Sequence, residues 1–202
     1  MRRKGAIPRP HRAVTIKRTD VPAPAIGVGA SPQTEILNKK TKPINSELRI
    51  MMNPENIRYI VVHCSATRCN ASYPAWLLES DHIKRGYKCA GYHYYIGRNG
   101  SIVPMRPLSM PGAHVRGYNY CSIGVCYEGG LAADGYPCDT RTASQKRSLE
   151  RLLRQLKARY PLAMVVGHRD LSPDRNGDGK VSSYEWLKAC PCFDAVKEYA
   201  QL

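Results

Sequence analysis

Two kinds of metal-binding side chain share one segment near the end of the chain, residues 168–194. His168 and Cys190 offer a nitrogen and a sulfur ligand, which suit zinc. Between them, acidic and amide side chains recur at alternate positions, and oxygen ligands of this kind suit calcium. The segment therefore predicts both a soft and a hard cation site.

The run from Asp174 to Glu185 reads D-x-N-x-D-G-x5-E, the pattern of the calcium-binding loop of an EF-hand. Oxygen ligands are expected from six residues: Asp174, Asn176, Asp178, Lys180 through its carbonyl, Ser182 and Glu185. The alternative is a polar surface loop that matches by chance, but Gly179 also falls at the sharp turn of the pattern. No helical pattern precedes the loop and a helix is expected over 184–189, so we interpret 174–185 as a single structural calcium loop.

A second histidine joins the zinc ligands at the end of another apolar run. His63 lies near the end of the β-branched stretch 57–64, and His168 ends the stretch 163–168. The ends of two strands can meet at one edge of a sheet, where sites commonly form, although a single histidine is more often structural. Together with Cys190, the two histidines would leave the fourth position of a tetrahedral zinc open to water, as in a catalytic site.

Strands and helices alternate along the rest of the chain. The expected elements, in chain order, are a strand over 57–64, a helix over 73–86, a hairpin over 91–105, a strand over 121–130, a helix from a capping box at Thr142 and Gln145 to Pro161, and a strand over 163–168. This order predicts an α/β (α+β) fold: a single domain, residues 56–202, with a central mixed β-sheet flanked by helices.

The chain of 202 residues carries a formal net charge of +15. Its first 50 residues hold eleven Lys and Arg against three acidic residues, with many prolines and no apolar period, so we expect residues 1–50 to form a flexible basic arm. A charge of this sign favours a polyanionic partner such as nucleic acid, an anionic membrane or an acidic wall polymer. No nucleic-acid-binding motif is recognisable, so no nucleic-acid partner is expected.

The sequence shows neither a secretory signal nor an apolar run of the roughly 20 residues that a membrane span needs. We therefore expect no transmembrane segment, synthesis in the cytoplasm with reduced thiols, and metal binding by some of the eight cysteines. Six cysteines are expected instead to be buried small apolar residues: Cys64, Cys69, Cys89, Cys121, Cys126 and Cys138. Cys69 and Cys89 could pair in an oxidising compartment, which sequence alone does not establish.

Five blocks occur in order, "IVVHCSAT", "GYHYYIGRNG", "AHVRGYNYCSIGVCYEGG", "GHRDLSP" and "KACPCFD". Together they resemble the zinc amidases of the T7 lysozyme and peptidoglycan-recognition-protein family, the type 2 amidases, over residues 56–196. One such block would be weak support, whereas five in order are specific. Matched block by block, the resemblance implies zinc ligands at His63, His168 and Cys190, catalytic residues at Tyr92 and Lys188, and substrate-groove residues at His114 and Asn119.

The resemblance also implies a reaction: hydrolysis of the amide between N-acetylmuramic acid and L-alanine in bacterial peptidoglycan, with zinc as cofactor. It implies a monomer that acts on the cell wall after release or export. The alternative function is a peptidoglycan-binding module without turnover, which loss of the zinc cysteine would have indicated. One departure concerns Cys192, where the T7 enzyme has a serine, because a second thiol could compete for the metal.

Overall fold

The computed structural model describes residues 51–202. The basic arm expected over residues 1–50 lies outside the described residues. Within 51–202, no helix is both long and apolar enough to cross a membrane.

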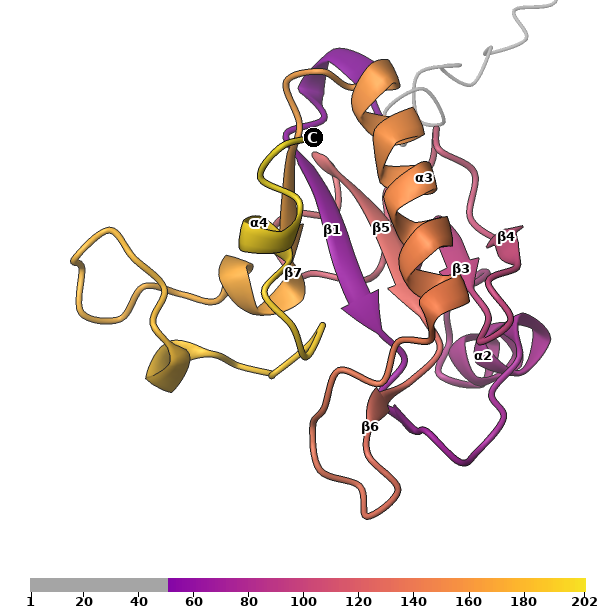
Figure 1. The fold of residues 1–202 in the computed structure, drawn as a ribbon. Helices are drawn as coiled ribbons and strands as arrows, with labels where there is room; N and C mark the ends of the chain where they lie inside the picture. The colour runs from indigo at the N-terminus through magenta and orange to yellow at the C-terminus, as the bar shows by residue number, and fades with distance from the viewer. Residues whose placement is uncertain (1–50) are drawn as a thin grey trace, which may run out of the picture. The chain divides into compact units, whose positions relative to one another are not determined.

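A five-stranded mixed sheet forms the centre of the domain (Figure 1). In spatial order its strands are β4 (Ile102–Pro104), β3 (Tyr94–Ile96), β5 (Ser122–Tyr127), β1 (Tyr59–Cys64) and β7 (Met164–Gly167). β1 pairs in parallel with β5 and with β7, β3 pairs in parallel with β5, and the edge strand β4 alone runs antiparallel. A separate pair joins β2 (Thr67–Arg68) to β6 (Gly130–Leu131). The expected mixed-sheet fold is confirmed.

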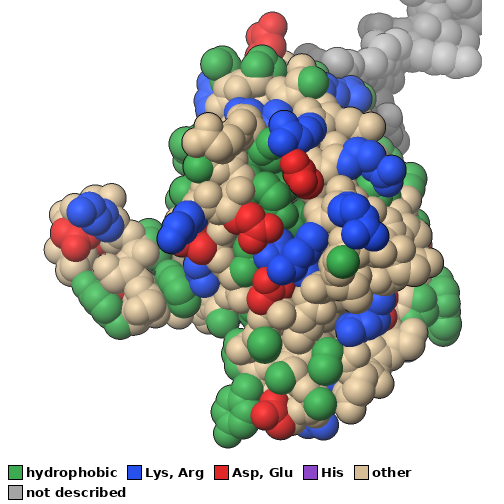
Figure 2. Space-filling model, viewed as in Figure 1, with side chains coloured by type: hydrophobic (Ala, Val, Ile, Leu, Met, Phe, Trp, Pro, Cys, Tyr) green, Lys and Arg blue, Asp and Glu red, His purple; other side chains and the backbone are tan. Residues whose placement is uncertain are grey.

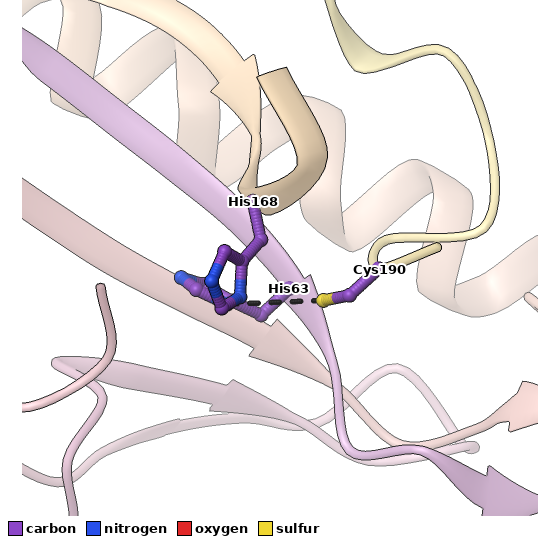
Figure 3. Close-up of side chains that lie close together, drawn as sticks. All are labelled: His63, His168 and Cys190. Atoms are coloured by element: carbon purple, nitrogen blue, oxygen red, sulfur yellow. Dashed lines mark hydrogen bonds between the residues drawn. The ribbon is translucent and has the colours of Figure 1, made fainter. Parts of the chain in front are cut away.

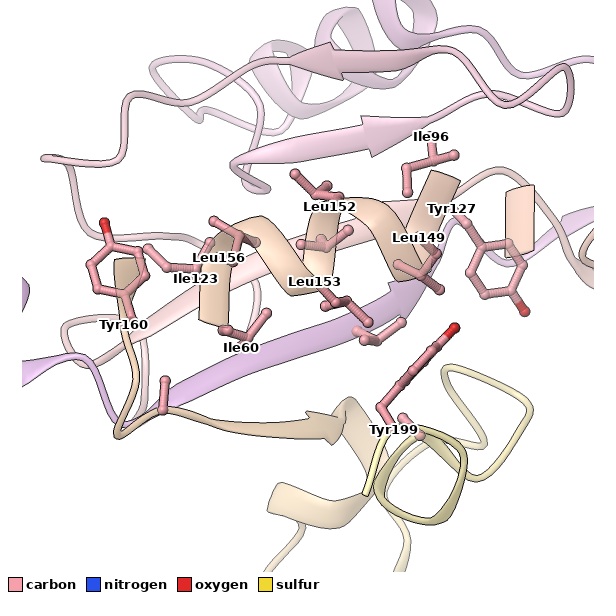
Figure 4. Packing of buried hydrophobic residues seen from close by; sticks show 14 of the residues in the cluster. Ile60, Ile96, Ile123, Tyr127, Leu149, Leu152, Leu153, Leu156, Tyr160 and Tyr199 are labelled. Carbon is pink, nitrogen blue, oxygen red and sulfur yellow. The ribbon is translucent and has the colours of Figure 1, made fainter. Parts of the chain in front are cut away.

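One long helix, α3 (Ala143–Arg159), covers one face of this sheet (Figure 1). It begins at the expected capping box, in which the side chains of Thr142 and Gln145 each accept a hydrogen bond from the other's backbone N–H, at 3.1 and 3.0 Å. Four buried leucines then recur at helical spacing and pack on Ile60 and Ile123 (Figure 4): Leu149, Leu152, Leu153 and Leu156. Each leucine contributes about 2 kcal/mol by leaving water, so this face holds most of the core.

The opposite face of the sheet carries the shorter helix α2 (Ala75–Lys84). Leu78 of α2 packs against Tyr95 and Cys126, and a further cluster joins Val61 to Val115. Successive side chains of a strand point to opposite faces, so Val62 of β1 faces α3 while Val61 and His63 face away from it. The face opposite α3 is therefore the one on which the histidine lies.

The segment after β7 contains only short helices: η2 (His168–Leu171), η3 (Ser183–Glu185) and α4 (Ala195–Glu198), and one more, η1 (Pro54–Asn56), precedes β1. Between η2 and α4 the chain forms a long loop that extends away from the sheet, at the left of Figure 1. The helix expected over 184–189 is therefore wrong. Trp186 already has an extended backbone, with φ −61° and ψ 123°, and this ends η3 after a single turn.

Candidate active site

Two histidines and a cysteine from distant parts of the sequence lie together where β1 and β7 end (Figure 3). The ligand atoms of His63, His168 and Cys190 all lie within 4.8 Å of one another, and the Sγ of Cys190 is 3.8 Å from Nδ1 of His63. Within residues 51–202, no other group of three or more His, Cys, Asp or Glu side chains is this compact. These are the three residues that the sequence predicts as zinc ligands.

The sheet explains why the three meet. Val62 of β1 lies opposite Gly167 of β7 in parallel register, so the next residues, His63 near the end of β1 and His168 directly after β7, lie at the same edge of the sheet. Cys190 is held there by backbone contacts. Its carbonyl accepts the N–H of Arg169 at 2.8 Å, and its Sγ accepts the N–H of Cys64 at 3.2 Å.

Burial keeps both imidazoles uncharged. It lowers the pKa of His63 well below 6.5, and the neighbouring His114, His168 and Lys188 lower it further. Burial also lowers the pKa of His168 to about 4, with the Lys188 ammonium adding to the effect. A metal binds only the neutral imidazole, so the site is ready for a cation over the neutral pH range.

The second thiol of the segment points elsewhere. The Sγ of Cys192 donates to the carbonyl of Gly130 at 3.1 Å and lies 3.8 Å from the Sγ of Cys64, outside the ligand group. All eight cysteines are free, so Cys69 and Cys89 are not paired. Of the six that were expected to be buried apolar residues, only Cys64 and Cys126 are buried. Cysteine burial depends on tertiary packing, which the spacing of cysteines does not report.

Tyr92 and Lys188 line one cavity of about 400 Å³ together with His168 and Cys190. The ring of Tyr92 lies 5.0 Å from that of His63, centroid to centroid. Burial raises the pKa of Tyr92 well above 10, so its phenol keeps its proton and can donate. Lys188 is exposed at the mouth of the cavity. The geometry thus brings both predicted catalytic side chains to the ligand group.

The two predicted groove residues take different places. His114 lines the cavity but is buried, with its Nδ1 2.9 Å from Nε2 of His63. Asn119 does not line the cavity, and its side-chain oxygen accepts the backbone N–H groups of His114 and Val115 at 3.0 and 3.1 Å. Their contact with substrate stays a prediction.

Other residues of the cavity were not singled out from the sequence. Leu78, His82 and Arg85 line it from α2 and the residue after it. Their spacing of four and three residues places them on one face of the helix, and this spacing is the signal in the sequence that could have identified them. A larger cavity of about 690 Å³, between α2 and the β3–β4 hairpin, contains none of the ligand residues.

In the segment 174–185, where calcium was expected, two carboxylates accept backbone N–H groups. The carboxylate of Glu185 is fully buried and accepts the backbone N–H groups of Arg175 and Ser182 at 2.8 and 2.7 Å. Asp174 accepts the N–H groups of Gly177 and Gly179 in the same way, at 2.7 and 2.8 Å. The acidic side chains of this segment do not form a compact ligand group of the kind found around His63. The calcium site stays a prediction that this geometry does not support.

The sequence matches a known family model, described as N-acetylmuramoyl-L-alanine amidase, over residues 53–182. An uncharacterised protein of Haemophilus influenzae is 49% identical over 48% of this chain and 83% of its own. The endolysin of Escherichia phage T7 is 34% identical over 69% of this chain and 83% of its own. Among solved structures, the N-acetylmuramoyl-L-alanine amidase LysC from Clostridium intestinale is similar with a TM-score of 0.55 and 26% identity, covering 72% of this chain and 83% of that one.

The family model covers well over half of the chain, and it includes β1, β7 and both histidines of the ligand group. The similarity to the phage endolysin extends over most of that protein's length. The chain therefore belongs to the N-acetylmuramoyl-L-alanine amidase family of peptidoglycan-directed enzymes.

Proposed function

We propose that the protein is a zinc-dependent hydrolase of the amide bond between N-acetylmuramic acid and L-alanine in bacterial peptidoglycan. The observation that carries the proposal is the compact group of His63, His168 and Cys190. His168 and Cys190 line one cavity with two hydrogen-bond donors, Tyr92 and Lys188. The names of the similar proteins, an endolysin and an N-acetylmuramoyl-L-alanine amidase, support the same reaction and the cell wall as its place.

The three side chains of the ligand group fit zinc. Two imidazoles and a thiolate match its preference for nitrogen and sulfur, and in a tetrahedral site such ligand atoms stand about 3.5 Å apart. The separations of up to 4.8 Å seen here differ from this by roughly an ångström, which small side-chain rotations can close. When bound, zinc would supply a water of pKa about 7 and polarise the scissile carbonyl.

Two hydrogen-bond donors of the protein can stabilise the negative charge that develops in the reaction. Attack on an amide carbonyl builds negative charge on its oxygen, and a preorganised donor near that oxygen is worth about 3 kcal/mol. The phenol of Tyr92 stays protonated because burial raises its pKa, and the Lys188 ammonium reaches the same cavity from solvent. We assign both side chains to stabilising the developing oxyanion.

Digestion of purified peptidoglycan tests the proposal. The expected result is release of stem peptides with a free L-alanine amino terminus, identified by mass spectrometry, and no new reducing sugar ends. Removal of the metal with a chelator should abolish release, and zinc should restore it. New reducing ends would indicate a glycosidase, and binding without release, with zinc present, would indicate the recognition module; either outcome contradicts the proposal.

A matched pair of variants tests which thiol binds the metal. Cys190→Ser should lose zinc, measured by elemental analysis, and more than about a hundredfold in activity, since it removes a ligand. Cys192→Ser should retain both, because that thiol lies outside the ligand group. The reverse pattern would show that Cys192, and not Cys190, binds the metal.

A further inference from the structure

His114 contacts a metal ligand rather than open solvent. Its Nδ1 lies 2.9 Å from Nε2 of His63, and the two rings meet edge to face with centroids 4.9 Å apart. The other ring nitrogen of His63, Nδ1, is the one that faces Cys190. The imidazole of His114 therefore contacts His63 through the ring nitrogen that does not face Cys190.

The fold makes room for this imidazole. A Cβ atom added to Gly112 would lie 2.3 Å from the His114 ring, and one added to Gly124 of β5 would lie 2.6 Å from it. Any side chain at either position would displace the ring, so both glycines are required by its close approach. Asn119 fixes the backbone beneath by accepting the N–H groups of His114 and Val115. The orientation of His114 is thus determined by its surroundings.

Ser122, His114 and His63 form a series of hydrogen bonds, and the carbonyl of Tyr118 determines their direction. Ser122 Oγ donates its only proton to the carbonyl of Tyr118 at 2.7 Å, so it can only accept from His114 Nε2, which lies 3.5 Å away, at the long limit of a hydrogen bond. A neutral His114 with its proton on Nε2 has a bare Nδ1, which accepts the Nε2–H of His63. His63 is then left with a bare Nδ1 on the side of the cavity.

The neighbouring His93 does not compete for His114. Its Nδ1 accepts the backbone N–H of Gly124 at 2.9 Å, so its Nε2 carries the proton and donates to the carbonyl of Met110 at 3.0 Å. Both nitrogens of His93 are engaged, and its ring only packs beside that of His114, at 5.9 Å between centroids.

We infer that His114 is a positioning residue for the metal: by accepting the Nε2–H of His63, it fixes the tautomer and ring orientation that present His63 Nδ1 as a ligand. The inference rests on the zinc site proposed above. Partners of this kind, which hold a ligand through its second nitrogen, typically change metal affinity by about 10–100-fold when they are removed. A side chain that only contacted substrate would leave metal affinity unchanged.

The inference is tested by the zinc affinity of the wild type and of two variants, His114→Ala and His114→Asn. The affinity is measured by competition with a chromophoric chelator at constant pH. His114→Ala removes the acceptor and should weaken zinc binding about 10–100-fold. His114→Asn keeps an oxygen acceptor near the position of Nδ1 and should recover most of that loss. At saturating zinc, kcat of His114→Ala should fall while KM stays near that of the wild type. Wild-type zinc affinity in His114→Ala, with a raised KM, would overturn the inference in favour of a substrate contact.

Imidazole nitrogen NMR of the wild-type zinc protein provides a test that needs no variant, in case His114→Ala does not fold. The expected spectrum shows protons on Nε2 of both His63 and His114. A proton on Nδ1 of His114 would overturn the inference while leaving zinc binding, and therefore the proposed function, intact. A wild-type protein that binds no zinc would overturn both.

Discussion

At the scale of single residues, Tyr92 and Lys188 reach the same cavity with different freedom. Tyr92 precedes β3, and its ring packs between those of His63 and His82, with centroids 5.0 and 5.6 Å away. Lys188 lies in the loop after η3 and is exposed. A packed phenol is positioned before substrate arrives, whereas an exposed ammonium loses side-chain entropy when it engages. The two proposed donors should therefore differ in how much of their effect on turnover depends on bound substrate.

Removal of either donor should reduce turnover without removing the metal. We expect Tyr92→Phe and Lys188→Met each to lower kcat about 10²–10³-fold, the usual effect of one oxyanion donor. Zinc content should stay at the wild-type level. Tyr120→Phe and Lys197→Met, at exposed positions outside the cavity, should change kcat less than about twofold. Loss of zinc from Tyr92→Phe would instead mean that the phenol supports the metal site.

The buried His93 should make stability depend on pH. Burial lowers its pKa from 6.5 to about 4, so between these values the unfolded chain binds a proton that the native His93 does not. Stability is then lost as the pH falls through this window, by about 1.4 kcal/mol per pH unit and roughly 3 kcal/mol in all. Urea unfolding of the metal-free wild type and of His93→Gln measures this, and the wild type should show the steeper loss. Parallel pH profiles would contradict the assignment.

At the scale of elements, the sequence predicts the strands better than the segment between η2 and α4. Apolar runs carry their own periodicity, so the strands around His63 and His168 and the capping box of α3 are recognisable locally. The residue types singled out Cys190 and Cys192 as soft ligands, but only the "KACP" block favoured Cys190 over Cys192, because no local pattern brings either thiol to β1. In the segment 174–185 the spacing matches a calcium loop, whereas the structure shows acidic oxygens that accept backbone N–H groups, an arrangement that the spacing does not distinguish from cation binding.

Glu185 should stabilise this loop through its charge. Its carboxylate accepts three backbone N–H groups, those of Arg175, Asn176 and Ser182, at 2.8, 3.3 and 2.7 Å. Glu185→Gln replaces one acceptor oxygen with a donor that faces an N–H, and such an unsatisfied contact costs about 1–3 kcal/mol. We expect faster hydrogen exchange over 172–187 and lower activity, because Cys190 follows closely.

Asp178→Asn is the matched control for the loop. Asp178 is exposed, and its Oδ1 accepts the N–H of Lys180, a bond that an amide oxygen can keep. The substitution loses only the exposed bond from Asn176 Nδ2 to Oδ2, so exchange and activity should change little. The same exchange measurement with added calcium tests the sequence-based expectation. Protection of 172–187 by calcium in the wild type, and its absence in Glu185→Gln, would support a calcium loop after all.

At the scale of the whole molecule, positive charge is distributed unevenly. Residues 1–50 contain eleven of the 31 Lys and Arg but only three of the 16 acidic residues. Over the face of the domain that carries α3, Lys and Arg side chains alternate with Asp and Glu (Figure 2). Pairs such as Arg154 with Glu150, at 2.8 Å, neutralise part of the helix surface. Long-range attraction to an anionic wall should therefore depend strongly on residues 1–50.

Deletion of residues 1–50 should separate wall binding from chemistry. The proposed ligand and donor side chains all lie between His63 and Cys190, so turnover of small soluble muropeptides should stay within about twofold of the full-length value. Sedimentation with intact anionic walls should weaken, because the deletion removes eleven positive and three negative charges. Raising the ionic strength from about 0.01 to 0.15 M shortens the Debye length from roughly 30 to 8 Å, and this should weaken the full-length protein more than the truncated one. A truncated protein that binds walls as well as the full chain, with the same dependence on salt, would show that the domain itself carries the attraction.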